Sequence, residues 1–183
     1  MLGTLVEAAK RGDEEAFGAL LHSVGDTCLA IAFRILRDVD LAEDAVQTAF
    51  ITAWRQLPSL RDPDRFEPWL HKTLVRACYA EARRSRRWTA KVRMLDIEGA
   101  SSADVLTVDD RDQLERGIRR LSPEHRAVLV FHDYLGLTLS EVADRLDIPL
   151  GTAKSRLHYA TAALRSALEA DARTPALGQE RLA

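Results

Sequence analysis

One short segment, residues 138–157, constrains the fold of this chain more than any other part of the sequence. It reads TLSEVADRLDIPLGTAKSRL. Thr138 and Glu141 have the spacing of a capping box, in which a hydroxyl and a carboxylate satisfy two backbone amides at the start of a helix. Pro149 disfavours helical geometry in the residue before it. The segment therefore predicts two short helices joined by a tight turn.

The second of these helices has an apolar face and a polar first turn. Its predicted buried side chains are spaced by four, three and four residues: Ala153, Leu157, Ala160 and Leu164. The polar side chains of the first turn are Thr152, Lys154, Ser155 and Arg156. A DNA-binding helix-turn-helix presents its second helix to the major groove in this way. The alternative is an ordinary helical hairpin within a helical protein.

The helical period of 3.6 residues extends over most of the chain, and no segment shows a convincing strand alternation. We therefore predict an all-α fold, with helices over 13–21, 27–36, 41–57, 69–87, 114–121 and 123–135 before the helix-turn-helix. The 183 residues, 46% of them hydrophobic, fit one large domain or two small ones.

A break in the pattern divides the chain. Residues 94–110 contain glycine, serine and acidic residues without a sustained apolar face, which is typical of a flexible linker. We expect a helical domain over 1–93, this acidic linker, a second helical domain over 111–174, and a frayed tail over 175–183.

The net charge of −2 conceals a strong segregation of charge. Residues 71–93 contain eight Lys and Arg against one acidic residue, whereas residues 94–115 contain one against seven. Lys and Arg side chains neutralise phosphates and release counterions, and the neighbouring aromatic rings could stack on separated bases. These rings belong to Trp69, Tyr79 and Trp88. The alternative is a solvated helix end whose arginines complement the helix dipole.

The predicted helix over 41–57 has two distinct faces. One is an apolar stripe that should be buried, formed by Ala42, Ala45, Val46, Ala49, Phe50, Ala53 and Trp54. Beside it lie Asp44, Gln47 and Ile51. A solvated face is the ordinary interpretation of such a row. A docking surface for a partner helix is the more specific alternative.

No pattern of catalytic, metal-binding or cofactor-binding residues stands out. The chain lacks the motifs GxxxxGK[ST], GxGxxG, GxSxG and HExxH, so we expect neither an enzyme nor a resident metal or cofactor. Cys28 and Cys78 are 50 residues apart among apolar neighbours, which favours buried thiols over a redox pair. His125 and His132 could share a helix face, although ordinary histidines are the simpler interpretation.

Apolar runs shorter than a membrane span and an N-terminus without a signal pattern predict a cytoplasmic protein without membrane insertion.

Four segments together resemble bacterial RNA polymerase sigma factors of the small, two-domain extracytoplasmic-function type. They are DLAEDAVQTAFITAWRQL, RFEPWLHKTLVRACYAEARRSRR, RGIRRLSPEHRAVLVFHDYLGLTLSEVADRL and IPLGTAKSRLHYATAALR, within residues 13–168. The resemblance implies a helical sigma-2-like domain, a sigma-4-like helix-turn-helix domain, and binding to core polymerase and to promoter DNA. It also implies an anti-sigma factor as a partner.

The resemblance assigns roles to particular residues. Asp44, Gln47 and Ile51 would bind the clamp helices of the largest polymerase subunit, and the second domain would bind the flap of the second-largest subunit. Contacts to the −10 element would come from Phe66, Trp69, Lys72, Arg76, Arg83 and Arg84. Contacts to the −35 element would come from Thr152, Lys154, Ser155, Arg156 and His158.

Several positions depart from the family pattern. Val75 and Arg76 stand where Arg-Asn is frequent, Tyr159 and Thr161 stand where Arg is frequent, and Asp147 replaces a frequent glycine. We therefore expect unusual promoter preferences, with Asp147 in a left-handed turn that aspartate tolerates. The competing function is a free-standing helix-turn-helix regulator that acts without polymerase.

Overall fold

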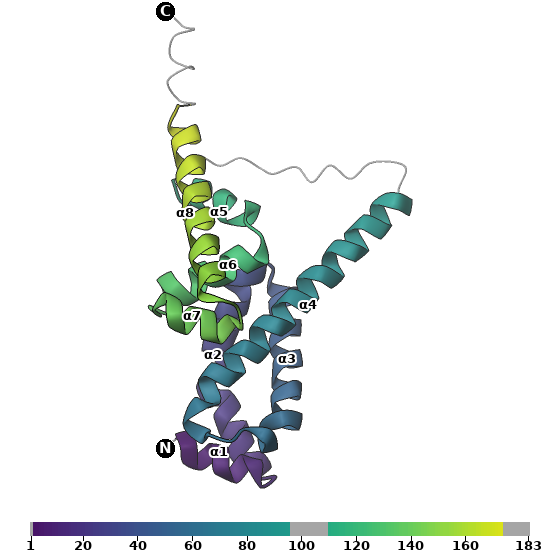
Figure 1. Ribbon diagram of the computed structural model, residues 1–183. Helices are drawn as coiled ribbons and strands as arrows, with labels where there is room; N and C mark the ends of the chain where they lie inside the picture. Colours follow the sequence, from purple (N-terminus) through teal and green to yellow (C-terminus); the bar gives the residue numbers. More distant parts are fainter. Residues whose placement is uncertain (1, 96–109, 174–183) are drawn as a thin grey trace, which may run out of the picture.

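The computed structural model describes residues 2–95 and 110–173, with side chains described over 2–90 and 114–169 (Figure 1). Within these ranges the regular structure is entirely helical, as predicted. Most of the predicted linker (94–110) and all of the predicted tail (175–183) lie outside the described residues.

The first half of the chain forms a bundle of four helices: α1 (Leu2–Lys10), α2 (Glu14–Leu36), α3 (Val39–Gln56) and α4 (Phe66–Leu95). The side chains of Asp13 and Asp38 cap α2 and α3 by accepting hydrogen bonds from backbone amides three residues ahead. Two short 3₁₀ turns, Leu57–Ser59 and Pro63–Arg65, connect α3 to α4.

The structure corrects several predicted boundaries in this bundle. The two helices expected over 13–21 and 27–36 are one continuous helix, because α2 passes through Gly25. A helical glycine costs about 1 kcal/mol, and burial of Leu20, Val24 and Cys28 around it offsets that cost. The helix α4 begins at Phe66 rather than Trp69, and α1 was not predicted.

The second half contains α5 (Asp110–Arg120), α6 (Pro123–Leu129), α7 (Leu139–Leu146) and α8 (Leu150–Arg173). Ser122 caps α6 in front of a proline at the first helical position. A π-helical turn, Val130–Tyr134, extends α6. At Gly117, α5 passes so close to α8 that an added Cβ would lie 3.1 Å from Leu164 Cδ2.

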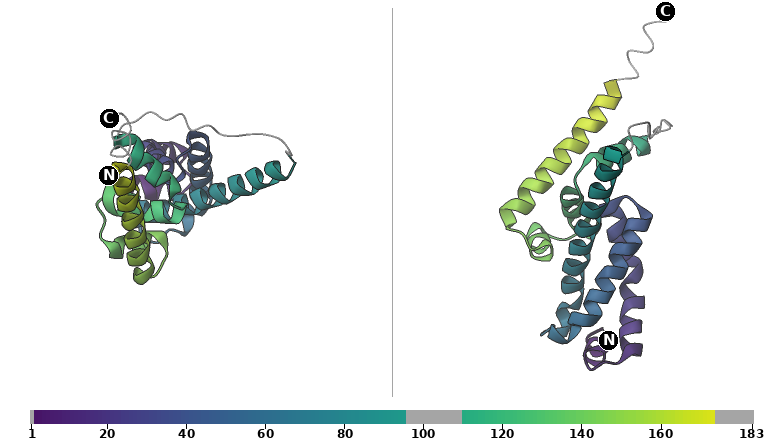
Figure 2. Two further views of the ribbon diagram at one scale, coloured as in Figure 1. Left: turned by 90° about the horizontal axis from the view of Figure 1, so that it is seen from above. Right: turned by 90° about the vertical axis from the view of Figure 1, so that its right-hand side faces the viewer.

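The two halves share a continuous hydrophobic core. It includes Leu70 and Leu74 from α4 together with Val128, Phe131 and Leu146 from the second half. The helices α6 and α7 therefore pack against α2 and α4. The C-terminal half of α4 projects away from this packed region in the views of Figures 1 and 2.

The helix α2 is long and apolar enough to cross a membrane, with a mean hydropathy of 1.5. This corrects the expectation that no apolar run approaches that length. The core helix of a soluble protein has the same properties, and here Leu20, Val24, Ile31 and Ile35 of α2 are buried inside the bundle.

Candidate nucleic-acid and polymerase interfaces

The helix-turn-helix predicted at residues 138–157 is present in full. The Thr138 hydroxyl accepts a hydrogen bond from the Glu141 amide, and the Glu141 carboxylate accepts one from the Thr138 amide at 2.8 Å, so the capping box is confirmed. Asp147 ends α7 in the left-handed conformation, with φ 58° and ψ 48°. Its amide donates to the carbonyls of Ala143 and Asp144, which satisfies the end of the helix before Pro149.

The start of α8 presents most of the predicted DNA contacts to solvent. Lys154, Ser155 and His158 are exposed, whereas Thr152 and Arg156 are half-buried. The opposite face packs inward through Ala153 and Ala160, both fully buried.

Two aromatic side chains, one from α6 and one from α8 itself, lie against each other. The rings of His125 and Tyr159 are 4.6 Å apart, although Tyr159 remains 59% exposed. Burial lowers the pKa of His125, and the nearby Arg156 lowers it further. Arg156 also acts on Tyr79 of α4, whose pKa burial raises far above its ordinary value. The half-buried Arg156 therefore interacts electrostatically with side chains from both halves of the chain, His125 and Tyr79.

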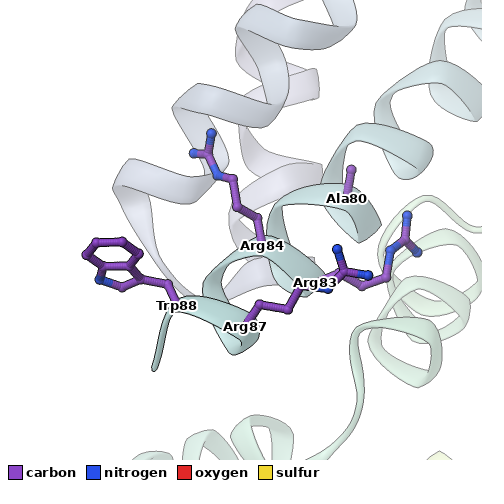
Figure 3. A pocket seen from close by; sticks show the side chains of 5 residues that line it. All are labelled: Ala80, Arg83, Arg84, Arg87 and Trp88. Atoms are coloured by element: carbon purple, nitrogen blue, oxygen red, sulfur yellow. The ribbon is translucent and has the colours of Figure 1, made fainter. Parts of the chain in front are cut away.

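The projecting half of α4 forms a basic surface with one large aromatic ring. Arg83, Arg84, Arg86 and Arg87 are all exposed, and Trp88 is 67% exposed. Arg83, Arg84, Arg87, Trp88 and Ala80 line an open pocket of about 480 Å³. Figure 3 shows that the side chains of Arg84 and Trp88 extend from one side of α4, whereas those of Arg83 and Arg87 extend from the other side. This arrangement can hold a phosphate backbone and stack a base.

The structure separates the other predicted −10 residues. The ring of Phe66 is fully buried and packs beside Trp69 with centroids 6.1 Å apart. Phe66 therefore supports the start of α4 from inside the core, and its predicted contact with a base does not fit this position. Trp69 and Lys72 are half-buried, whereas Arg76 is exposed. Val75, next to it, is a core residue at 2% exposure.

The predicted polymerase-binding face lies on α3, where Asp44, Gln47 and Ile51 are all exposed. Ile51 borders an open groove of about 480 Å³ whose apolar lining includes Phe17, Phe50 and Trp54. Trp54 is 36% exposed, so the apolar stripe of α3 is only partly buried, contrary to the expectation from its spacing. The ring of Phe17 covers part of Trp54 at a centroid distance of 4.7 Å.

A set of polar contacts joins the two halves, and sequence reasoning missed them. Asp147 pairs with both Lys72 and Arg76, at 2.8 Å each. Arg145 donates to Nδ1 of His71 at 2.7 Å. Arg37 forms two hydrogen bonds to the Glu115 carboxylate. The partners are more than 70 positions apart, so the sequence contains no local signal for these pairs.

The remaining candidate residues have structural environments. Cys28 and Cys78 are buried free thiols, as predicted, and burial raises the pKa of each to about 12. Nδ1 of His132 lies 2.7 Å from the carbonyl of Leu137. Over the described residues, no group of His, Cys, Asp or Glu has the geometry of a metal site.

Comparisons with known proteins agree with this architecture. Residues 20–89 match the family Sigma-70 region 2, and residues 117–166 match Sigma-70, region 4. The ECF RNA polymerase sigma factor SigL of Mycobacterium tuberculosis is 34% identical over 167 residues, covering 86% of this chain and 94% of SigL. SigW of Bacillus subtilis is 26% identical, covering 92% of this chain and 97% of SigW.

Solved structures have the same fold. CnrH, in complex with the cytosolic domain of CnrY, aligns over 93% of this chain and 98% of CnrH with a TM-score of 0.64 and 25% identity. The sigma factor RpoE of Bartonella quintana, in complex with the anti-sigma factor NepR, aligns over 85% of this chain and 98% of RpoE with a TM-score of 0.65 and 24% identity. The chain therefore belongs to the ECF family of RNA polymerase sigma factors.

Proposed function

We propose that this protein binds core RNA polymerase, directs it to promoters by binding the −10 and −35 elements, and helps to open the duplex at the start site. One observation carries the proposal. A single chain of this family has three separate exposed surfaces: the start of α8, the basic and aromatic half of α4, and the polar face of α3. A sigma factor needs one surface for each DNA element and one for the polymerase.

Binding to the −35 element is assigned to Thr152, Lys154, Ser155, Arg156 and His158. Lys and Arg donate hydrogen bonds to base edges in the major groove, above all to guanine. The positive end of the α8 dipole favours a phosphate near Thr152. Tyr159, exposed where Arg is frequent in the family, adds an aromatic edge instead of a charge.

Binding to the −10 element is assigned to the separated non-template strand, along α4. Trp69, Lys72 and Arg76 lie at its base, and Arg83 and Arg84 lie farther along with Arg87 and Trp88. Arginines track a single-stranded backbone, and an exposed indole ring stacks on a base of any identity. We leave Phe66 out of this surface because its ring is buried.

Core polymerase is assigned to Asp44, Gln47 and Ile51, with the clamp helices of the largest subunit as the partner. The adjoining groove supplies apolar area beside the polar row, which is a common composition for a protein interface. The flap of the second-largest subunit would bind the second domain. The domains are proposed as residues 1–95 and 110–174, which moves the predicted boundary to the end of α4.

An anti-sigma factor is a further proposed partner, on the basis of the family and of the complex of its structural relative RpoE. The role is non-enzymatic and cytoplasmic, because polymerase and chromosomal DNA are the ligands.

Run-off transcription tests the proposal. Core polymerase with this chain and sheared genomic DNA should yield discrete transcripts that core polymerase alone does not. The chain should also co-purify with core polymerase. If it binds duplex DNA specifically but never associates with polymerase, the free-standing regulator is the correct function.

A further inference from the structure

The carboxylate of Asp147 occupies the base of the surface assigned to the −10 strand. Its Oδ1 atom lies 2.8 Å from Nζ of Lys72, and its Oδ2 atom lies 2.8 Å from Nη2 of Arg76. Lys72 and Arg76 are four positions apart and thus share one face of α4. One anion therefore bridges two cations, as a backbone phosphate would.

The backbone geometry of the turn after α7 directs the Asp147 carboxylate toward α4. Asp147 is in the left-handed conformation at the end of α7, and α7 packs against α4. Figure 1 shows α7 and the start of α8 beside the N-terminal half of α4. The hydrogen bond and charge of Lys72, followed by those of Arg76, hold the pKa of Asp147 below its ordinary value, so the carboxylate is ionised at neutral pH.

Neighbouring contacts hold the same closed arrangement. His71 packs its ring edge-on against Phe131 at 5.5 Å and accepts a hydrogen bond from Arg145. On the other side of the interface, Arg37 pairs with Glu115, and the Arg34 guanidinium lies 3.8 Å above the ring of Tyr134. The interface thus combines an apolar centre with polar contacts to charged groups, several of which are exposed to solvent.

This arrangement conflicts with simultaneous binding of two promoter elements. The turn that leads into the DNA-reading helix lies directly on Lys72 and Arg76, which belong to the other DNA surface. A chain that contacts two separate stretches of DNA must move these surfaces apart.

We propose that Asp147 is an intramolecular competitor for promoter DNA, which holds the chain closed by occupying Lys72 and Arg76 until the two halves separate. The inference rests on the proposed function, since it concerns the regulation of the same −10 surface. Polymerase would favour the open state if its clamp helices and its flap bind the two halves of the chain more tightly when these halves are apart.

The expected shift in the ratio of closed to open chain follows from the strength of exposed ion pairs. Each such pair shifts an equilibrium by up to about fivefold, so loss of both should lower the ratio of closed to open chain about 3- to 10-fold. If the closed state dominates, the apparent affinity for single-stranded DNA rises by the same factor, because it is reduced by the closed fraction.

The experiment compares the full-length chain with Asp147→Asn and with the matched control Asp144→Asn. Asparagine tolerates the left-handed conformation, so the turn is retained. Asp144 is exposed on the same helix, and its substitution removes the same charge while leaving the Lys72 and Arg76 pairs in place. Circular dichroism verifies that all three chains are folded.

Two measurements are made without polymerase. Fluorescence anisotropy with a labelled dT20 strand gives the affinity. Energy transfer between dyes at Ser59→Cys and Ser140→Cys, both exposed positions in different halves, gives the closed fraction. The native thiols of Cys28 and Cys78 are buried and remain unlabelled.

Asp147→Asn should raise dT20 affinity about 3- to 10-fold without raising energy transfer, whereas Asp144→Asn should change affinity less than about twofold. If the affinity does not rise, if energy transfer increases, or if both substitutions act equally, the proposal is overturned. Failure to capture core polymerase would instead refute the proposed function and leave these two measurements interpretable.

Discussion

Arg84 of α4 places its Nη2 atom 3.0 Å from Oδ2 of Asp44 on α3. This ion pair joins two surfaces that the proposed function assigns to different partners, since Asp44 belongs to the polymerase face and Arg84 to the −10 surface. Both side chains are more than half exposed, so the pair itself contributes at most about 1 kcal/mol. A polymerase that engages Asp44 would leave Arg84 with Glu81, at 2.8 Å, as its remaining ion-pair partner.

Substitution of Asp44 and Gln47 by Ala should weaken polymerase binding without unfolding the protein. We expect core-polymerase affinity to fall at least about tenfold, because both side chains lie on the exposed face of α3. Pull-down titration measures this effect. Glu43→Ala, exposed on the same helix, and Arg84→Ala, which breaks the pair but keeps Asp44, are the controls. Undiminished capture by the double variant would argue against this face.

Lys154→Ala or Arg156→Ala should reduce promoter recognition by about 1–3 kcal/mol and relax selectivity at the contacted base pairs. Arg165→Ala, exposed farther along α8, should have little effect. Run-off transcription from the cognate promoter and from single-base variants measures both quantities. The assignment of α8 fails if the Lys154 and Arg156 variants retain full selectivity.

The arginines and the indole of α4 should differ in their dependence on salt. Arg83→Ala or Arg87→Ala should lower the salt slope for binding a dT20 strand by about 0.7 per phosphate contact. Trp88→Ala should instead cost about 1–3 kcal/mol at every salt concentration, because stacking carries no net charge. Arg11→Ala, exposed between α1 and α2, is the control. An equal slope change for Trp88→Ala would contradict the stacking role.

Phe66→Ala should act on stability rather than on base recognition. Removal of a fully buried ring leaves a cavity and costs about 3–5 kcal/mol of unfolding free energy. Chemical denaturation followed by circular dichroism measures this loss. A variant of unchanged stability that binds the −10 strand poorly would restore the direct-contact interpretation.

Acid should weaken the packing around His71. Burial, and secondarily Arg145, lower the pKa of His71 from 6.5 to about 4 in the folded chain. Between these values the unfolded chain takes up a proton that the folded chain does not. The contribution of His71 to stability is therefore complete above pH 6.5 and falls by roughly 3 kcal/mol as the pH approaches 4.

Denaturation midpoints at pH 7.5 and pH 5 test this dependence. Wild-type protein should lose more stability between the two pH values than His71→Gln, whereas the exposed His22→Gln should behave like wild type. Identical losses in all three chains would show that His71 takes up its proton equally in both states.

The sequence predicted the helix-turn-helix with nearly correct boundaries because its signals are local. The capping box of Thr138 and Glu141, the stop before Pro149 and the start of α6 at Pro123 each depend on residues within one helical turn. The same holds for the exposed row of Asp44, Gln47 and Ile51, which follows from helical spacing. The apolar spacing of α3 was a less reliable guide, since Trp54 remains 36% exposed beside the ring of Phe17.

Predictions from local sequence were wrong where packing against distant residues determined the structure. Gly25 resembled a break between helices, but the buried side chains of α2 keep it helical. Phe66 lies in a charged, proline-rich segment before the helix predicted over 69–87, yet it begins α4 and its ring is fully buried.

The sequence by itself therefore determined the helices, their caps and the chemistry on each face, because hydrogen bonding and side-chain periodicity act over a few neighbouring residues. Only the tertiary structure decided which charged groups meet. Asp147 and Arg76 are 71 positions apart, and no periodicity relates them. Their pairing depends on how two bundles pack, and that packing is set by the shared apolar core rather than by either local sequence.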